Sequence, residues 1–194
     1  MIAVSSSRGI SFVALMAALG NVLSFISIQL APLVPSIPLG PVSVSLALDF
    51  SHLATFIAAL LGGPVVGGLT GLVGGSVAAF EFGFSKGNIL TGIGLPLGKA
   101  LTGVAAGLLF RSLRNGKLKL VAATVVSYVP EAVFTWVLFV YLFPPILGFP
   151  QELATVVAIQ ILVKAFIEML IMAAILGSLT GSKGLQAFSR SITT

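Results

Sequence analysis

The chain has 194 residues, of which 57% are hydrophobic and only 8% are charged, and its mean hydropathy is +1.16. Water-soluble domains carry roughly a quarter charged residues, so this composition excludes an ordinary soluble protein. In a membrane protein the net charge of +5 orients the helices and does not indicate nucleic-acid binding, because basic residues are retained on the cytoplasmic side. Cysteine is absent, which excludes disulfides and thiolate chemistry.

Six apolar stretches have about the length that a helix needs to cross a bilayer, which is roughly 17 to 25 residues. They cover residues 10–30, 46–61, 64–80, 89–110, 120–143 and 153–179. Lipid cannot satisfy free backbone polar groups, so we expect every stretch to be helical. The predicted fold class is therefore all-α, with a single domain over residues 1–194 that forms an integral membrane bundle of six helices.

The basic residues predict the orientation of this bundle. Only Lys86 falls outside when the N-terminus is placed inside, while Lys99 and Lys164 lie within spans. The other seven fall on the inner side: Arg8, Arg111, Arg114, Lys117, Lys119, Lys183 and Arg190. This asymmetry predicts that both termini are cytoplasmic.

The first span carries Ala14 and Ala18 on one helix face. A strip of small side chains allows another helix to approach closely, either inside the bundle or from another membrane subunit. The span is followed by a loop, residues 31–44, that contains four prolines and no charge. This loop and the similar stretch 143–151 are either interfacial connectors or an outer cover that keeps water out of a small-molecule pocket.

Polar side chains inside the spans are the candidates for a binding site, because a charge at membrane depth costs several kcal/mol unless it is paired or hydrated. The predicted substrate-binding residues are Asp49, Asn88, Glu131, Trp136, Gln160, Lys164 and Glu168. Asp49 and Asn88 also stand where helix caps are expected. We expect His52 to be a hydrogen-bonded structural residue and Lys99 to pair with an acid that the sequence does not identify.

Three of these candidates form a polar stripe in the last span. Lys164 and Glu168 are spaced i, i+4, and Gln160 lies one turn earlier, so they are either a mutually neutralised pair with a neighbour or one wall of a cavity. Glu131 follows Pro130 in the fifth span. We expect an irregularity in the helix there, because proline leaves a backbone carbonyl without its hydrogen bond, and Glu131 places an acidic side chain beside it. Trp136 is placed either to stack on an aromatic ligand or to lie in the interfacial belt of aromatic residues.

Motifs for catalysis are missing from the sequence. It contains neither a His-Glu-x-x-His zinc motif nor a Gly-x-Ser-x-Gly nucleophile, and its glycine-rich stretch 62–75 lacks the Lys-Ser/Thr ending of a phosphate-binding loop. We therefore predict no catalytic residues, no metal site and no cofactor.

The chain resembles the substrate-binding S components of energy-coupling factor (ECF) vitamin transporters over nearly its whole length. The matching features are the Ala14-x-x-x-Ala18 strip, the proline-rich loop, the sequence Leu48-Asp49-Phe50-Ser51, and Gly63-Pro64 followed by Gly67 and Gly71. The resemblance implies a multi-pass protein of a prokaryotic plasma membrane. It also implies that the alanine strip docks to a T component and that two ATPase subunits drive uptake.

The same resemblance implies a vitamin-like substrate in an outward-facing cavity, formed by spans four to six and the loop after span one. The Leu48-Asp49-Phe50-Ser51 sequence is most similar to riboflavin-type members, in which Lys164 would contact the ligand and Asn88 is a looser candidate. The alternative function is a stand-alone channel or facilitator for a small solute, which requires a continuous polar track across the membrane.

Overall fold

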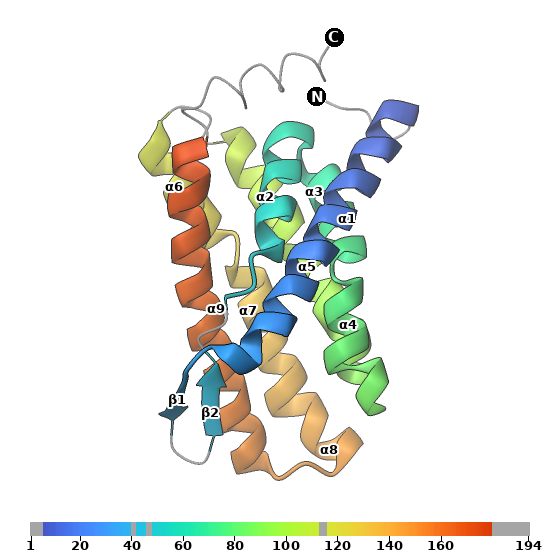
Figure 1. The fold of residues 1–194 in the computed structure, drawn as a ribbon, viewed down its shortest axis with the longest axis vertical. Helices are drawn as coiled ribbons and strands as arrows, with labels where there is room; N and C mark the ends of the chain where they lie inside the picture. Colours follow the sequence, from blue (N-terminus) through green and yellow to red (C-terminus); the bar gives the residue numbers. More distant parts are fainter. Residues whose placement is uncertain (1–5, 40–41, 46–47, 113–115, 180–194) are drawn as a thin grey trace.

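The computed structural model describes residues 6–39, 42–45, 48–112 and 116–179. Five helical stretches are long and apolar enough to cross a membrane, and a shorter apolar helix accompanies them. They run along a common direction and form one bundle (Figure 1). Large apolar side chains such as Leu15 and Val133 point outward from it, as is expected where the surrounding solvent is lipid. The prediction of an all-helical membrane bundle is thus confirmed for the spans.

The elements follow one another in this order. The chain forms α1 (Ser7–Leu30), η1 (Ala31–Leu33), β1 (Ser36–Leu39), β2 (Val42–Ser45), α2 (Ser51–Gly62), α3 (Pro64–Gly74), α4 (Ser76–Phe82), η2 (Phe84–Lys86), α5 (Ile89–Ser112), α6 (Lys117–Val126), α7 (Val129–Trp136), the π-helix η3 (Val137–Leu142), α8 (Phe143–Leu147) and α9 (Gln151–Leu179). Here η1 and η2 are short 3-10 helices.

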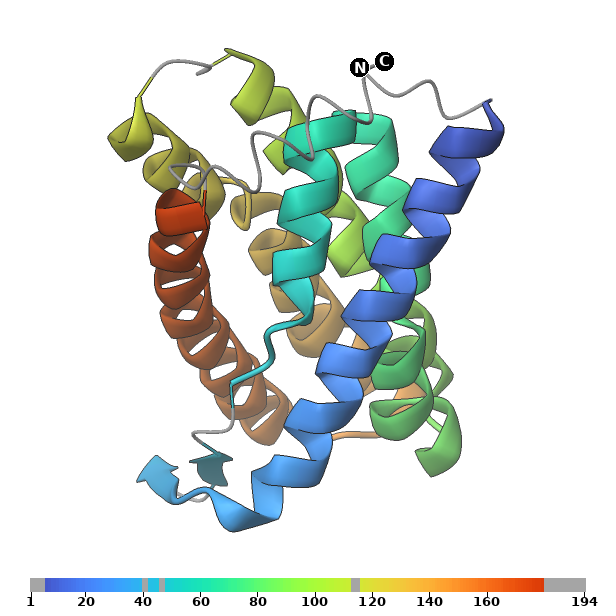
Figure 2. The same cartoon turned by 45° about the horizontal axis from the view of Figure 1, so that its top comes forward.

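Helix α2 departs from the predicted span 46–61, because it begins only at Ser51. Its 12 residues are about 18 Å long, which is roughly half the thickness of a bilayer core. Figure 2 shows α2 in one half of the bundle, with the preceding chain running without helical structure toward the hairpin of β1 and β2. The side chain of Asp49 explains the late start, because its Oδ1 accepts a hydrogen bond from the Ser51 amide at 2.9 Å.

The proline-rich loop is not purely irregular, since β1 and β2 form an antiparallel hairpin that the sequence analysis did not predict. Ser36 pairs with Ser45 and Leu39 pairs with Val42. The hairpin lies at the end of the bundle where α8 is found, and β2 packs against α9. Pro41 and Gly40 lie outside the described residues.

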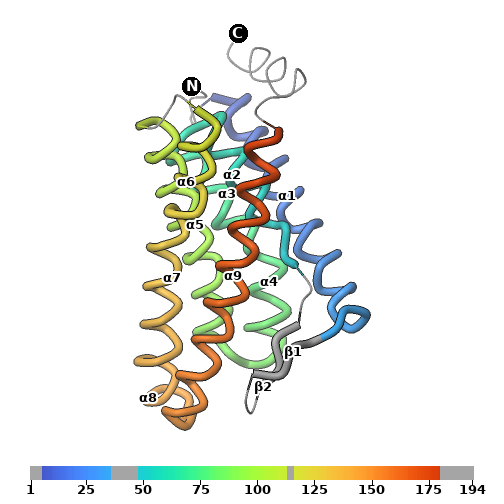
Figure 3. Tube along the Cα trace, turned by 90° about the vertical axis from the view of Figure 1, so that its left-hand side faces the viewer, coloured from blue at the N-terminus to red at the C-terminus, as the bar shows by residue number. Residues whose placement is uncertain are grey.

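Two of the predicted spans are broken helices. The third consists of α3 and α4, with a break at Gly75. The fifth runs from Lys117 to Leu147 through α6, α7, η3 and α8, and it is interrupted just before Pro130, which has no amide donor to continue the ladder. Figure 3 shows this composite span lying beside α9.

Glycines allow the closest helix contact in the bundle, between α3 and α5. A Cβ added to Gly67 would lie 2.6 Å from the carbonyl oxygen of Gly103, so only glycine permits this approach of the two backbones. A large apolar core adjoins this contact and is built around Phe56, Met169, Met172 and Leu176, which are fully buried. It also includes Phe110 near the end of α5, so it fills the end of the bundle that carries Arg111 and Lys117.

The described basic residues support the predicted asymmetry along the bundle. Arg8 begins α1, Arg111 ends α5, and Lys117 and Lys119 begin α6, and these helix ends meet at one end of the bundle (Figure 1). Lys86 follows α4 at the opposite end. Arg114, Lys183 and Arg190 lie outside the described residues, so their predicted side remains a prediction.

Candidate functional site

A cavity of about 420 Å³ occupies the half of the bundle that contains the hairpin and α8. Its walls come from the C-terminal part of α1, from α4, from the N-terminal part of α5, and from α7, η3 and α9. The start of α2 and residue Asp49 close it toward the middle of the bundle. The volume is in the range of small-molecule sites, which is roughly 300 to 1,000 Å³.

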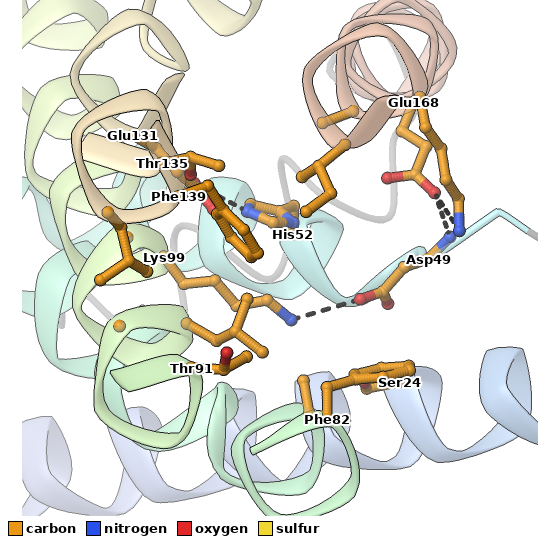
Figure 4. A pocket seen from close by; sticks show the side chains of 18 of the residues that line it. Ser24, Asp49, His52, Phe82, Thr91, Lys99, Glu131, Thr135, Phe139 and Glu168 are labelled. Atoms are coloured by element: carbon orange, nitrogen blue, oxygen red, sulfur yellow. Dashed lines mark hydrogen bonds and ion pairs between the residues drawn. The ribbon is translucent and has the colours of Figure 1, made fainter. Parts of the chain in front are cut away.

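Charged residues are concentrated around this cavity. Three of the five acidic residues of the chain line it, together with the only histidine and two lysines. Figure 4 shows Asp49, His52, Lys99, Glu131 and Glu168 arranged around one open space. Because charges at membrane depth are costly unless they are paired or used, this concentration marks the cavity as the candidate functional site.

Lys99 joins α5 to the chain that leads into α2. Its ammonium group lies 3.3 Å from Oδ2 of Asp49 and donates a short hydrogen bond to the hydroxyl of Ser51. Lys99 is only 4% exposed, whereas the side chain of Asp49 keeps 27% of its surface exposed. Gly98 on α5 allows Glu131 to approach closely, since a Cβ at this position would lie 3.1 Å from Cγ of Glu131.

His52 and Glu131 form a second buried pair. Nε2 of His52 lies 3.0 Å from Oε2 of Glu131, and the hydroxyl of Thr102 donates to the same oxygen at 2.5 Å. The pair links α2, α5 and α7 across the bottom of the cavity. Nδ1 of His52 is buried and has no hydrogen-bond partner among the described residues.

Glu168 on α9 completes the polar wall. Its Oε1 accepts a hydrogen bond from the backbone amide of Asp49 at 2.8 Å and lies 3.7 Å from Nζ of Lys164. The side chain of Lys164 is one-third exposed, so this ion pair is looser than that of Lys99. The hydroxyl of Ser27 donates to the carbonyl of Leu48 at 2.7 Å, and it thereby fixes the same non-helical stretch to α1.

Aromatic side chains form much of the remaining wall. Phe82, Tyr128, Phe139 and Phe143 line the cavity, and the rings of Phe139 and Phe143 are 4.3 Å apart. Aromatic rings and charged groups therefore both line the cavity, so a flat ligand can contact rings and still find polar partners.

Five of the seven predicted substrate-binding residues line the cavity: Asp49, Asn88, Glu131, Lys164 and Glu168. Asn88 also caps α5, because its Oδ1 accepts from the amide of Thr91 at 3.0 Å. Gln160 is half-buried on α9 and is not part of the lining, and Trp136 packs beside the apolar cluster of Leu138, Phe139 and Phe143. The structure therefore places these two residues outside the cavity.

Two titratable residues of the site were not among the predicted binding residues, namely His52 and Lys99. The sequence analysis treated His52 as structural and paired Lys99 with an unidentified acid. Both residues stand in otherwise apolar helices, and this position could have marked them as site residues. The spacing along the sequence, however, indicates neither the residue that each one pairs with nor the side of the helix that faces the cavity. The polar residues Ser24, Thr91 and Thr135 were also missed.

The predicted docking strip on α1 lies on the outer surface. Ala14 and Ala18 are exposed, whereas Ala17, which faces the bundle, is fully buried. The described residues contain no group of three or more His, Asp or Glu side chains with the geometry to hold a metal ion.

Comparisons with known proteins agree with this architecture. The model of the family described as the ECF transporter, substrate-specific component, matches residues 8–179. A solved structure of the S component of a bacterial ECF transporter is similar with a TM-score of 0.62 and 19% identity, over 88% of this chain and 94% of that one. The curated protein sequences contain no match. Because the family model covers most of the sequence, the chain belongs to the family of substrate-specific components of ECF transporters.

Proposed function

We propose that this chain captures a vitamin or a related small metabolite from the outer side of a prokaryotic plasma membrane, with riboflavin favoured. It then docks to a T component, and two ATPase subunits drive the uptake of the captured molecule. The observation that carries this proposal is a cavity of about 420 Å³ whose walls combine buried charges with aromatic rings. A substrate-specific component needs such a site to select its cargo.

The distribution of charge supports the orientation that capture from outside requires. Arg8, Arg111, Lys117 and Lys119 lie at the end of the bundle away from the cavity. Basic residues favour the cytoplasmic side, so the cavity opens toward the outside. The hairpin of β1 and β2 then lies at the outer end, next to the mouth of the cavity.

The exposed alanine strip supports docking to another membrane subunit. Ala14 and Ala18 face away from the bundle, and their small side chains allow a partner helix to approach closely. The chain carries no nucleotide-binding loop in its sequence, so ATP-driven uptake depends on partner subunits.

Riboflavin is favoured by the resemblance of the Leu48-Asp49-Phe50-Ser51 sequence and by the composition of the site. The aromatic wall suits a flat ring system, and Lys164 and Asn88 line the same cavity. Lys164 is the more accessible of the two lysines, with one-third of its side chain exposed. It is therefore suited to contact a polar edge of the ligand.

A channel or facilitator is the alternative, and the packing argues against it. Beyond the cavity, the fully buried side chains of Phe56, Met169, Met172 and Leu176 fill the inner half of the bundle. Such a core interrupts the polar track that a channel requires, so the cavity is closed at its inner end.

The test uses the full chain expressed with and without a T component and two ATPases. Replacement of both Ala14 and Ala18 by tryptophan is expected to abolish co-purification and uptake of labelled riboflavin while riboflavin binding to the purified chain is retained. Val133→Trp, at an exposed position on α7, is the matched control and is expected to leave uptake intact. Uptake that persists without partner subunits would instead support the facilitator.

A further inference from the structure

The charges that line the cavity do not include a surplus cation. Among the described lining residues, three carboxylates face two lysines and one histidine. The net charge of the lining is thus −1 when His52 is neutral and zero when it is protonated. The proline-rich segment 31–48 adds no charge, because it contains no acidic or basic residue.

Both lysines are already engaged with carboxylates. Lys99 is almost completely buried against Asp49 and Ser51. Lys164 lies 3.7 Å from Glu168. A lysine that met an anionic ligand would have to share its charge between the ligand and the carboxylate that it already faces, so the lining offers an anion no unshared positive charge.

The acceptor capacity of Glu168, in contrast, is only partly used. The two contacts of the Glu168 carboxylate both involve Oε1, and Figure 4 shows the other oxygen turned toward the open space. This second oxygen can accept a hydrogen bond from a bound molecule.

We propose that the substrate bears no net negative charge and presents a hydrogen-bond donor to Glu168, and that the cavity rejects the phosphorylated form of the same molecule. This inference rests on the proposed function, because it specifies the class of metabolite that the cavity accepts. A flat ring that carries an N–H or amino group fits both the aromatic side chains of the lining and the free oxygen of Glu168.

The experiment compares matched pairs of ligands on the purified full-length chain by titration calorimetry. The pairs are riboflavin and riboflavin 5′-phosphate, thiamin and thiamin phosphate, and pyridoxamine and pyridoxamine 5′-phosphate. In any pair that binds, we expect the phosphorylated member to bind roughly 100-fold more weakly, because its added negative charge is repelled by the carboxylates of the lining and finds no unshared lysine.

Two variants connect this selectivity to the cavity. Glu168→Gln removes one negative charge from the lining. The ratio of the two dissociation constants within a pair is then expected to fall to roughly tenfold, because about one charge–charge interaction is lost. Glu152→Gln, at an exposed position at the start of α9, is the matched control and should leave the ratio unchanged.

The outcomes separate the two proposals. Equal or tighter binding of a phosphorylated member overturns the inference and leaves vitamin capture standing. An unchanged ratio in Glu168→Gln overturns the role assigned to that carboxylate. Failure of all three pairs to bind contradicts vitamin capture itself. The inference that the substrate bears no net negative charge is then rejected with it.

Discussion

Nε2 of His52 lies 3.0 Å from Oε2 of Glu131, and this contact ties the short helix α2 to α7 beneath the cavity. Both side chains are about nine-tenths buried. The hydroxyl of Thr102 reaches the same carboxylate oxygen from α5, so three helices depend on one acidic side chain. Glu131 is therefore both a wall of the cavity and a structural link.

Loss of this link should lower stability strongly. Glu131→Ala leaves His52 and Thr102 without their shared acceptor, and we expect a loss of about 3–5 kcal/mol in the free energy of unfolding. Glu131→Gln keeps an acceptor oxygen in place and should cost less. Thermal unfolding of the purified variants checks the order, with Glu81→Gln as a control on the half-buried face of α4. Equal melting temperatures for the alanine variant and the wild type would contradict the structural role of the pair.

The Lys99–Asp49 pair should show energetic coupling in a double-mutant cycle. Lys99→Met and Asp49→Asn each remove one charge of a pair whose N–O distance is 3.3 Å. We expect each single variant to be destabilised and the double variant to be less so than the sum, with a coupling energy of about 0.5–3 kcal/mol. Chemical unfolding in detergent measures the four free energies. If the effects of the two single variants on the free energy of unfolding were strictly additive, the two charges would not interact.

Lys164 and Gln160 lie one turn apart on α9, yet only Lys164 lines the cavity. Lys164→Met should weaken riboflavin binding by roughly tenfold or more, because a hydrogen bond to a charged group contributes about 1.5–3 kcal/mol. Gln160→Ala should change the dissociation constant by less than about twofold, a difference of about 0.4 kcal/mol. Quenching of flavin fluorescence measures both. A larger effect of the Gln160 variant would mean that α9 is rotated relative to the arrangement described above.

Two glycines of α3 provide a matched test of helix packing. A Cβ at Gly67 would lie 2.6 Å from the carbonyl oxygen of Gly103, whereas the nearest atom to a Cβ at Gly74 would be 3.5 Å away, a normal contact. We therefore expect Gly67→Ala to destabilise the bundle by about 1–3 kcal/mol. Gly74→Ala should be neutral or stabilise it by up to about 1 kcal/mol, since alanine favours helix. Similar melting temperatures for the two variants would contradict the close contact of α3 and α5.

The amino-acid sequence predicts the spans and the polar character of the site well, for a clear physical reason. Long apolar runs must be helical in lipid, and an ionisable residue inside such a run needs a partner or a function. Asp49, Glu131, Lys164 and Glu168 stand out on this ground alone, and all of them line the cavity. The pairing of Lys99 with Asp49 was not predictable, because it depends on how α5 packs against a chain segment 50 residues away.

Two features could not be predicted from the sequence: which residues of α7 and α9 face the cavity, and the residue at which α2 begins. Gln160, Lys164 and Glu168 share one face of α9, and the spacing alone does not determine how far along this face the cavity extends, so the sequence did not show that Gln160 lies outside the lining. Trp136 is the last residue of α7, where its neighbour Thr135 lines the cavity and Trp136 itself packs against an apolar cluster, and the sequence does not determine which of the two faces inward. The run from Leu46 to Phe50 is apolar except for Asp49, and the non-helical conformation of Leu48 to Phe50 is held by contacts with Ser27 and Glu168 together with the bond from the Ser51 amide to Asp49.

This non-helical stretch has a mechanical consequence. The amide of Asp49 depends on the carboxylate of Glu168, and that carboxylate also borders the space available to a cargo. A displacement of Glu168 therefore acts directly on the main chain that leads into α2, without intervening side chains.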